Sequence, residues 1–225
     1  LPPFSPTGTH AVEQRHERVA RDEGPRREVE EPVRPLLLDL GRAVLDGADA
    51  LMLSGETSVG AFAIDAVKTM ARIIARTEEA MLNRIPPLEH NPSTKGGAIT
   101  KAAAEVGAII GAKFLVAFTE SGDSARRMSR LRSAIPILAF TPNAHVYNQL
   151  ALSWGVEPLV APTVDHTDEM VMQVDTLLID SNRCQQGEYV IIVAGAPPGI
   201  PGSTNALRAH KIGDAVTGVA AAYRK

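Results

Sequence analysis

The chain has 225 residues, of which 44% are hydrophobic and 22% charged, and its formal net charge is −3 at pH 7. This length is enough for one large domain or two modest domains with a sizeable core. The small negative charge, with no basic face, argues against a nucleic-acid partner, and no apolar run approaches the length of a membrane span. The single cysteine, Cys184, cannot form an internal disulfide, which fits the reducing cytoplasm. The histidines are scattered and show no spacing typical of a metal site.

The first 40 residues differ in composition from the rest of the chain. Charged residues occur in clusters, at residues 13–18 and 26–31, prolines are frequent, and the few apolar residues show no period. Such a composition predicts a disordered segment. Two explanations stay open: a natural disordered tail, or unrelated sequence that a frame error has placed before the globular part, which begins near Gly41.

Residues 41–84 have the pattern of a strand followed by a loop and a helix, which is half of a βαβ crossover. A short helix at residues 36–45 leads into this unit. The apolar run at residues 48–53 predicts a buried parallel strand. After residue 62 the apolar period becomes that of a helix ending near residue 83, and one face of this helix carries Ile64, Val67, Ala71 and Ile74.

The loop at residues 54–60 follows the carboxyl end of the expected strand, where α/β barrels carry their chemistry. Ser54, Glu56 and Thr57 are therefore candidates for the rim of an active site. The alternative is that the hydroxyls of Ser54 and Thr57 only satisfy backbone amides of a turn or a helix cap.

A proline-rich stretch, within residues 85–97, marks the boundary to a second unit. Helical and strand patterns then alternate to the end of the chain, which predicts a mostly parallel sheet covered by helices on both faces. The expected helices are residues 98–110, 124–132, 143–154 and 167–183, and Asn143, which follows Pro142, is the expected N-cap of the third. The expected strands are residues 113–118, 135–140, 156–160 and 189–194, with one more over residues 205–212.

Hydroxyl-bearing residues follow the first of these strands, where the chain turns into a helix. The candidates for ligand contact there are Thr119, Ser121, Gly122 and Ser124. Backbone N–H groups at such a turn, with hydroxyls beside them, suit a phosphate, and Gly122 lets the backbone approach an anion closely. The alternative is an ordinary capped turn, which the carboxylates of Glu120 and Asp123 favour because they oppose an anion.

A second loop, at residues 195–205, is rich in glycine and proline and also follows the end of a strand. Because the carboxyl ends of parallel strands meet at one edge of a sheet, this loop is placed to fold over a ligand held at residues 119–124. The alternative is a rigid tight turn that contacts no ligand.

Three motifs make residues 41–225 resemble pyruvate kinases: L-D-G-A-D-A-L-M-L-S-G-E-T at residues 45–57, T-x-S-G-x-S-A at residues 119–125, and G-x-T-N at residues 202–205. In that family the second motif binds the phosphate of an allosteric effector, and the third closes on it. The resemblance therefore implies an effector phosphate site formed by Thr119, Ser121, Gly122, Ser124, Gly202 and Thr204. Many members that respond to fructose 1,6-bisphosphate carry a lysine where this chain has Glu120, so the implied effector is a sugar monophosphate or AMP.

The fold that the resemblance implies is α/β. Residues 41–84 correspond to the last βα unit of a (β/α)8 barrel, and residues 98–225 to the C-terminal allosteric domain, a mostly parallel α/β sandwich. One strand of eight cannot close a barrel, so the strand at residues 48–53 is expected to have unpaired edges.

The resemblance also implies the family's reaction, which is phosphoryl transfer between phosphoenolpyruvate and ADP in glycolysis with Mg²⁺ and usually K⁺. The family's catalytic and metal-binding motifs, K-I-E, A-R-G-D-L and T-Q-M-L, do not occur in this sequence. We therefore expect neither catalytic nor metal-binding residues, and a truncated form that is inactive alone. Family members form tetramers, so a homo-oligomer is implied. The alternative is a non-catalytic regulatory module that binds a phosphorylated metabolite or a full-length homologue.

Overall fold

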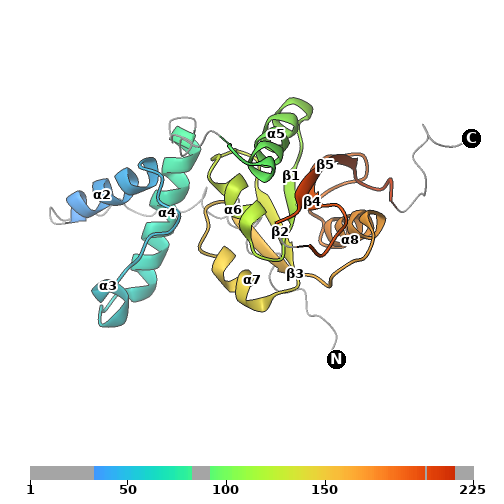
Figure 1. Cartoon of the computed structure of the whole chain (residues 1–225). Helices are drawn as coiled ribbons and strands as arrows, with labels where there is room; N and C mark the ends of the chain where they lie inside the picture. The colour runs from blue at the N-terminus through green and yellow to red at the C-terminus, as the bar shows by residue number, and fades with distance from the viewer. Residues whose placement is uncertain (1–32, 83–91, 201, 216–225) are drawn as a thin grey trace, which may run out of the picture. The chain divides into compact units, whose positions relative to one another are not determined.

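The computed structural model of the chain describes residues 33–82, 92–200 and 202–215. The chain forms two compact units, Leu1–Ile85 and Pro86–Lys225, and each is described by itself (Figure 1). The disorder expected for the first 40 residues falls mostly outside the described residues. Residues 33–40 are helical.

The first unit contains three helices in its described part: α2 (Val33–Leu45), α3 (Gly55–Ser58) and α4 (Ala63–Met81). Helix α2 includes the short helix expected at residues 36–45. It packs against α4, and the two approach closely at Gly41, where a Cβ would lie 3.5 Å from Thr77 Oγ1. A Cβ at this position would be in ordinary van der Waals contact with Thr77, so the helices meet here without requiring glycine.

The strand expected at residues 48–53 does not form, and that prediction is wrong. These residues have no partner in a β-ladder, and the Met52 side chain is 87% exposed. An apolar run becomes a strand only where a second strand accepts its backbone hydrogen bonds. The described residues of this unit contain no second strand, so the segment runs between α2 and α3 without regular structure.

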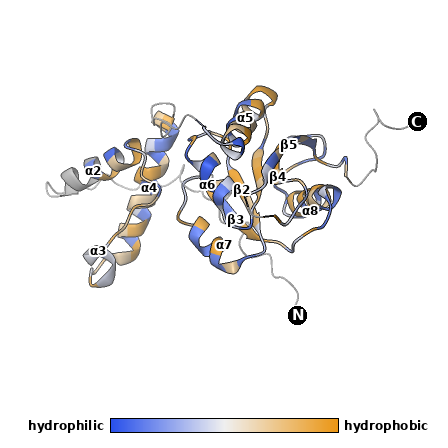
Figure 2. Cartoon of the chain, in the orientation of Figure 1, coloured by the Kyte–Doolittle hydropathy of each residue, from blue (hydrophilic) through white to orange (hydrophobic). Residues whose placement is uncertain are grey.

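Helix α4 forms where it is expected, but much of the face named from its sequence pattern is exposed. The side chain of Ile64 is 71% exposed and that of Val67 49%, whereas Ala66, Met70 and Ile73 are partly covered. Figure 2 shows apolar residues along the length of α4. The described helices of this unit are too few to cover a helix on every side.

The second unit is built on a five-stranded sheet with the strand order β3-β2-β1-β4-β5. The strands are β1 (Phe114–Phe118), β2 (Ile137–Thr141), β3 (Val156–Val160), β4 (Tyr189–Gly195) and β5 (Thr204–Lys211). Strand β1 pairs in parallel with β2 and β4, and β2 pairs in parallel with β3. Strand β5 runs antiparallel to β4. The prediction of a mostly parallel α/β sheet is confirmed.

Four helices accompany this sheet: α5 (Lys95–Ile110), α6 (Asp123–Ser129), α7 (Ala144–Leu150) and α8 (Thr167–Asp180). Side chains cap two of them. Thr94 Oγ1 accepts a hydrogen bond from the Gly97 N–H at the start of α5, and Asn143 Oδ1 accepts from the N–H groups of His145 and Val146 at the start of α7. The cap predicted at Asn143 is confirmed.

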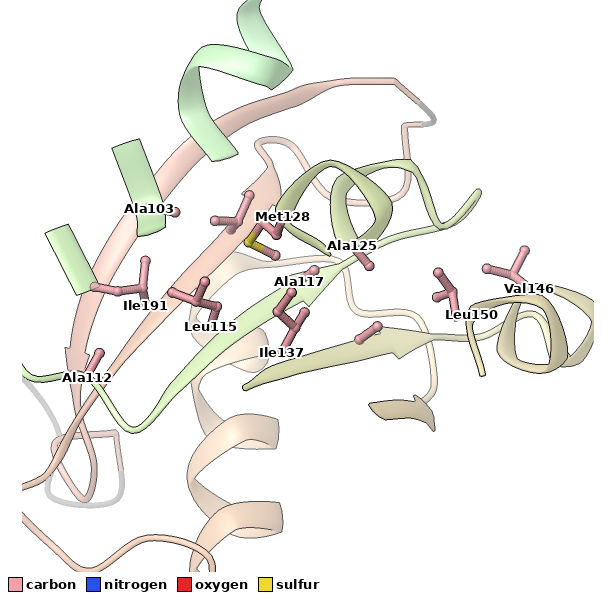
Figure 3. Close-up of a cluster of buried hydrophobic side chains, with 12 residues drawn as sticks. Ala103, Ala112, Leu115, Ala117, Ala125, Met128, Ile137, Val146, Leu150 and Ile191 are labelled. Carbon is pink, nitrogen blue, oxygen red and sulfur yellow. The ribbon is translucent and has the colours of Figure 1, made fainter. Parts of the chain in front are cut away.

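The core lies on both faces of the sheet because successive strand residues point to opposite sides. On one face, Leu115 and Ala117 of β1 belong to a buried cluster with Ala103 of α5 and with Ala125 and Met128 of α6 (Figure 3). On the other face, the intervening strand residues cluster with α8. Helices therefore cover both faces, and the strand ends at the sheet edge are left for loops.

Candidate functional site

A pocket lies at the edge of the sheet where the parallel strands end. Residues that follow β1, β2, β3 and β4 line it, together with Met170 of α8. Its volume is about 660 Å³ when the open mouth and the solvent in it are included. The two loops singled out from the sequence, at residues 119–124 and 195–205, both contribute residues to the pocket lining.

The loop between β1 and α6 forms a tight turn around Gly122. Gly122 has φ +82°, a left-handed conformation that glycine adopts without strain. Its N–H donates a hydrogen bond to Thr119 Oγ1 over 2.9 Å, and the Thr119 N–H donates to the Phe140 carbonyl of the neighbouring strand. The turn therefore fixes the Thr119 hydroxyl at the pocket.

The loop between β4 and β5 is closed at its base by Asn205. The Asn205 side-chain amide exchanges two hydrogen bonds with the backbone of Ala196, each 2.7 Å long. Gly195 lies so close to Ser203 that a Cβ on it would collide with Ser203 Oγ. A side chain at this position would force the Ser203 hydroxyl to turn away, so the loop lies close against the end of β4.

A side-chain hydrogen bond joins the two loops. Ser124 Oγ and Thr204 Oγ1 are 2.6 Å apart, and Ser124 is only 4% exposed. The second loop therefore lies against residues 119–124, as expected for two loops at the carboxyl ends of parallel strands. One of the two hydroxyls donates its O–H in this hydrogen bond, so the other can donate its own O–H to an anion in the pocket.

The charged side chains that line the pocket are the carboxylates of Glu120 and Asp123, and its described lining contains no lysine or arginine. Asp123 is paired with Arg127, whose Nε lies 2.7 Å from Asp123 Oδ2. Glu120 therefore adds negative charge to the pocket, and this charge disfavours a ligand with several phosphates.

Apolar side chains also form part of the pocket wall. The rings of Phe118 and Phe140 pack with their centroids 5.0 Å apart and their planes tilted by 30°, and Met170 and Val164 extend this wall. The pocket lining thus combines the hydroxyl-bearing residues of the two loops with apolar side chains. This arrangement suits a small molecule with one polar, charged end.

The structure brings together most of the pocket residues proposed from the sequence. Thr119, Ser121, Ser124, Gly202 and Thr204 all line the pocket. Gly122 shapes the turn behind them. Sequence reasoning missed the apolar wall, whose residues lie at the ends of β1 and β2, after β3 and on α8. The rule that parallel strands end at one edge would have pointed to the residues after β2 and β3.

The candidates in the first unit form a local network. Thr57 Oγ1 donates to the Ser54 carbonyl over 3.1 Å, and the Ser54 N–H donates to Glu56 Oε2 over 3.0 Å. Hydrogen bonds from backbone N–H groups, its own first and then that of Ser54, hold the pKa of the Glu56 carboxyl below its usual value. The Ser54 side chain makes no cap hydrogen bond to α3. These contacts stabilise a turn and, by themselves, identify no ligand.

A buried polar network lies away from the pocket lining, between α8 and the end of β5. Asp175 Oδ1 is 2.6 Å from His210 Nε2, and Asp175 Oδ2 accepts hydrogen bonds from the N–H groups of Gly213 and Ala215. Asp175 is fully buried and His210 is 2% exposed. Since three donors satisfy the carboxylate, the network is a structural link between α8, β5 and the following turn.

The part of the chain that the structure describes contains neither a cluster of metal-ligating side chains nor a helix that could span a membrane. That part holds no group of three or more His, Cys, Asp or Glu residues arranged to bind a metal ion. Among its helices, none is both long enough and apolar enough to cross a bilayer.

Residues 97–210 match a family described as "Pyruvate kinase, alpha/beta domain". A pyruvate kinase of Mycobacterium tuberculosis (strain ATCC 25618 / H37Rv) is 51% identical over 183 residues, which cover 81% of this chain and 39% of that protein. A pyruvate kinase of Corynebacterium efficiens is 45% identical over 183 residues, covering 81% of this chain and 38% of its own length. The chain thus spans about two fifths of the length of these relatives.

The solved structures that resemble this chain are also pyruvate kinases. A crystal structure of a Cryptosporidium parvum pyruvate kinase is similar with a TM-score of 0.69 and 29% identity, covering 80% of this chain and 36% of that one. A structure of the C. parvum enzyme in complex with ADP has a TM-score of 0.66 and 31% identity, with 80% and 37% covered.

Proposed function

Because this chain belongs to the pyruvate kinase family, we propose that its second unit is the regulatory domain of such an enzyme and that its pocket binds the phosphate group of a small metabolite. The hydrogen bond between Ser124 and Thr204 is the observation that carries this proposal. It joins two loops at the carboxyl edge of a parallel sheet, where α/β proteins bind ligands.

The proposed phosphate contacts are the residues of these two loops: Thr119, Ser121, Gly122, Ser124, Gly202 and Thr204. Hydroxyl and backbone N–H donors suit phosphate oxygens because they bind without adding a charge that must be desolvated. The apolar wall around Phe140 and Met170 supports a ligand body that is a sugar or a nucleobase.

The ligand that fits this pocket has one phosphate group. A second phosphate would need another set of donors or a cation, and the described lining offers the Glu120 carboxylate instead. A sugar monophosphate or AMP is therefore the proposed effector, rather than a bisphosphate.

The proposed activity of the whole protein is that of the family, namely phosphoryl transfer between phosphoenolpyruvate and ADP with Mg²⁺ and K⁺, in the cytoplasm and in a homotetramer. The chain spans about 39% of its relatives' length, and its sequence lacks the family's catalytic motifs. These 225 residues alone are accordingly expected to form no pyruvate, and Ser54, Glu56 and Thr57 are proposed as rim residues that act only with the rest of a barrel.

A second candidate is a non-catalytic regulatory module that binds a phosphorylated metabolite or a full-length homologue. The observation that favours it is that the second unit has a complete sheet with a buried core on both faces. The two candidates differ in their effect on a full-length homologue: a regulatory module should change its rate of pyruvate formation when the chain is added, whereas an inactive fragment should leave that rate unchanged.

The experiment that tests the pocket is isothermal titration of the full chain with AMP and with glucose 6-phosphate, using adenosine and glucose as uncharged controls. Saturable binding of either phosphate compound, with no binding of its control, supports the proposal. The absence of binding at millimolar ligand, in a chain whose circular dichroism shows a folded α/β protein, contradicts it.

A further inference from the structure

The charges that line the pocket are unfavourable for an anion. Two carboxylates and no cationic side chain are among its lining residues, and anions bind poorly where the nearest charges are negative. A site for phosphate needs a positive charge that acts from outside the lining.

Arg126 of α6 supplies such a charge from behind the loop between β1 and α6. Its Nη1 donates a hydrogen bond to the Ser121 carbonyl over 2.9 Å. A Cβ placed on Gly122 would lie 3.1 Å from Cζ, Nη1 and Nη2 of Arg126. The guanidinium group therefore lies directly against the peptide unit that joins Ser121 and Gly122.

Helix α7 holds the guanidinium group in this position. Arg126 Nη2 donates to Gln149 Oε1 over 3.0 Å, and Gln149 Nε2 lies 2.9 Å from His145 Nε2. Since the Gln149 oxygen accepts from Arg126, its amide NH₂ group faces the histidine, and the ring nitrogen accepts. The neighbouring Asp123 is paired with Arg127, so the charge of Arg126 is not offset by that carboxylate.

A chain of hydrogen bonds leads from Arg126 into the pocket. The Ser121 carbonyl and the Gly122 N–H belong to one peptide unit, and the Gly122 N–H donates to Thr119 Oγ1. A cation at the carbonyl end polarises this peptide and strengthens its N–H as a donor. Because the Thr119 oxygen accepts from Gly122, its own O–H is available to donate to a ligand at the pocket surface.

We propose that Arg126 is the positioning residue that makes this pocket select anions: it fixes the Ser121–Gly122 turn and supplies the positive charge behind the donors. The inference rests on the proposed function, since it concerns the phosphate that the pocket is proposed to bind. Arg126 itself stays behind the loop and does not contact the ligand.

The test compares Arg126→Gln with Arg130→Gln in the full chain, using glucose 6-phosphate as the probe. Both variants remove one positive charge from the same segment, but Arg130 is exposed, and among the described residues no hydrogen bond or ion pair joins its guanidinium to the loop. Arg126→Gln is expected to weaken binding roughly fivefold or more, and Arg130→Gln less than about twofold. The dependence of Kd on salt should also become shallower in Arg126→Gln only, a change that a purely structural role would not produce.

Two further variants keep the inference falsifiable if Arg126→Gln fails to fold. Arg126→Lys retains the charge but cannot bridge Ser121 and Gln149 at once, so it should bind with intermediate affinity and an unchanged salt dependence. Gln149→Leu should weaken binding about twofold by releasing the guanidinium group.

The outcomes separate the two proposals. If the unchanged chain fails to bind glucose 6-phosphate and AMP, the proposed function is wrong and the role of Arg126 falls with it. If the unchanged chain binds but Arg126→Gln binds equally well, or with the same salt dependence, the pocket is still a phosphate site and the proposed role of Arg126 is wrong.

Discussion

The hydroxyl groups of Ser124 and Thr204 lie 2.6 Å apart although 80 positions separate the two residues in the chain. Ser124 is in the first turn of α6 and Thr204 is the first residue of β5. Their contact fixes the distance between two loops that follow different strands. The pocket has its shape because of this contact, and changes at either residue should affect binding more than folding.

Ser124→Ala is the direct test of this contact. The variant removes a buried hydroxyl and should weaken phosphate binding by about 1–2 kcal/mol, because a hydrogen bond to a charged group is lost. Titration calorimetry with glucose 6-phosphate measures the change. Ser129→Ala is the matched control, since Ser129 is buried in the same helix and donates to the Trp154 carbonyl. It should cost stability and leave affinity unchanged, and equal losses of affinity in both variants would contradict the prediction.

Glu120→Lys should change which phosphates bind. The substitution replaces a carboxylate in the pocket lining with a cation, so affinity for a hexose bisphosphate should rise roughly tenfold relative to a monophosphate. Competition between fructose 1,6-bisphosphate and glucose 6-phosphate measures this ratio. Glu105→Lys, an identical charge change on an exposed position of α5, should leave the ratio unchanged. An unchanged ratio in Glu120→Lys would show that residue 120 does not decide the ligand.

Asn205→Ala should loosen the loop between β4 and β5. The variant loses both hydrogen bonds to Ala196, and the expected cost is about 1 kcal/mol because the site is exposed to water. Limited proteolysis followed by mass spectrometry should find faster cleavage in this loop. Asn148→Ala, exposed on α7, serves as the comparison and should be cleaved like the unchanged chain.

Asp175→Asn should destabilise the second unit without altering the pocket. The asparagine presents an NH₂ group to some of the three donors that now surround the carboxylate, which leaves buried donors unpaired at a cost of roughly 3 kcal/mol. Urea denaturation followed by circular dichroism gives the free energy of unfolding. Asp180→Asn, exposed in the same helix, should be close to neutral. A small loss in Asp175→Asn would mean that the network contributes little.

The thiol of Cys184 should be unreactive in the folded chain. Burial, and secondly the nearby Glu188 carboxylate, raise its pKa to about 11 from an ordinary value of 9.0, so little thiolate exists near neutral pH. The unfolded chain loses this proton above pH 9.0, whereas the folded chain keeps it until about pH 11. The thiol therefore does not change the free energy of unfolding below pH 9.0, and that free energy falls as the pH rises from 9.0 toward about 11. Iodoacetamide should label the native chain slowly and the urea-unfolded chain quickly. Equal rates would contradict the burial of Cys184.

Local patterns in the sequence were enough to predict the elements of the second unit. Runs such as residues 135–140 and 189–194 are apolar on both faces, and the cap at Asn143 is a short-range signal. Each of these depends on neighbours within a few residues. The parallel-sheet rule then predicted correctly that the loop after β1 and the loop after β4 meet, because parallel strands end at one edge.

Long-range packing decided what the sequence did not. Residues 48–53 have the same apolar character as the strands of the second unit, yet they form no ladder, because a strand depends on a partner that its own residues do not encode. The contact of Arg126 with Ser121 and the apolar wall around Phe140 depend on side-chain directions fixed by helices and strands far away in the chain. The sequence by itself thus determined the elements and the edge where the pocket lies, and only the tertiary structure decided which side chains meet there.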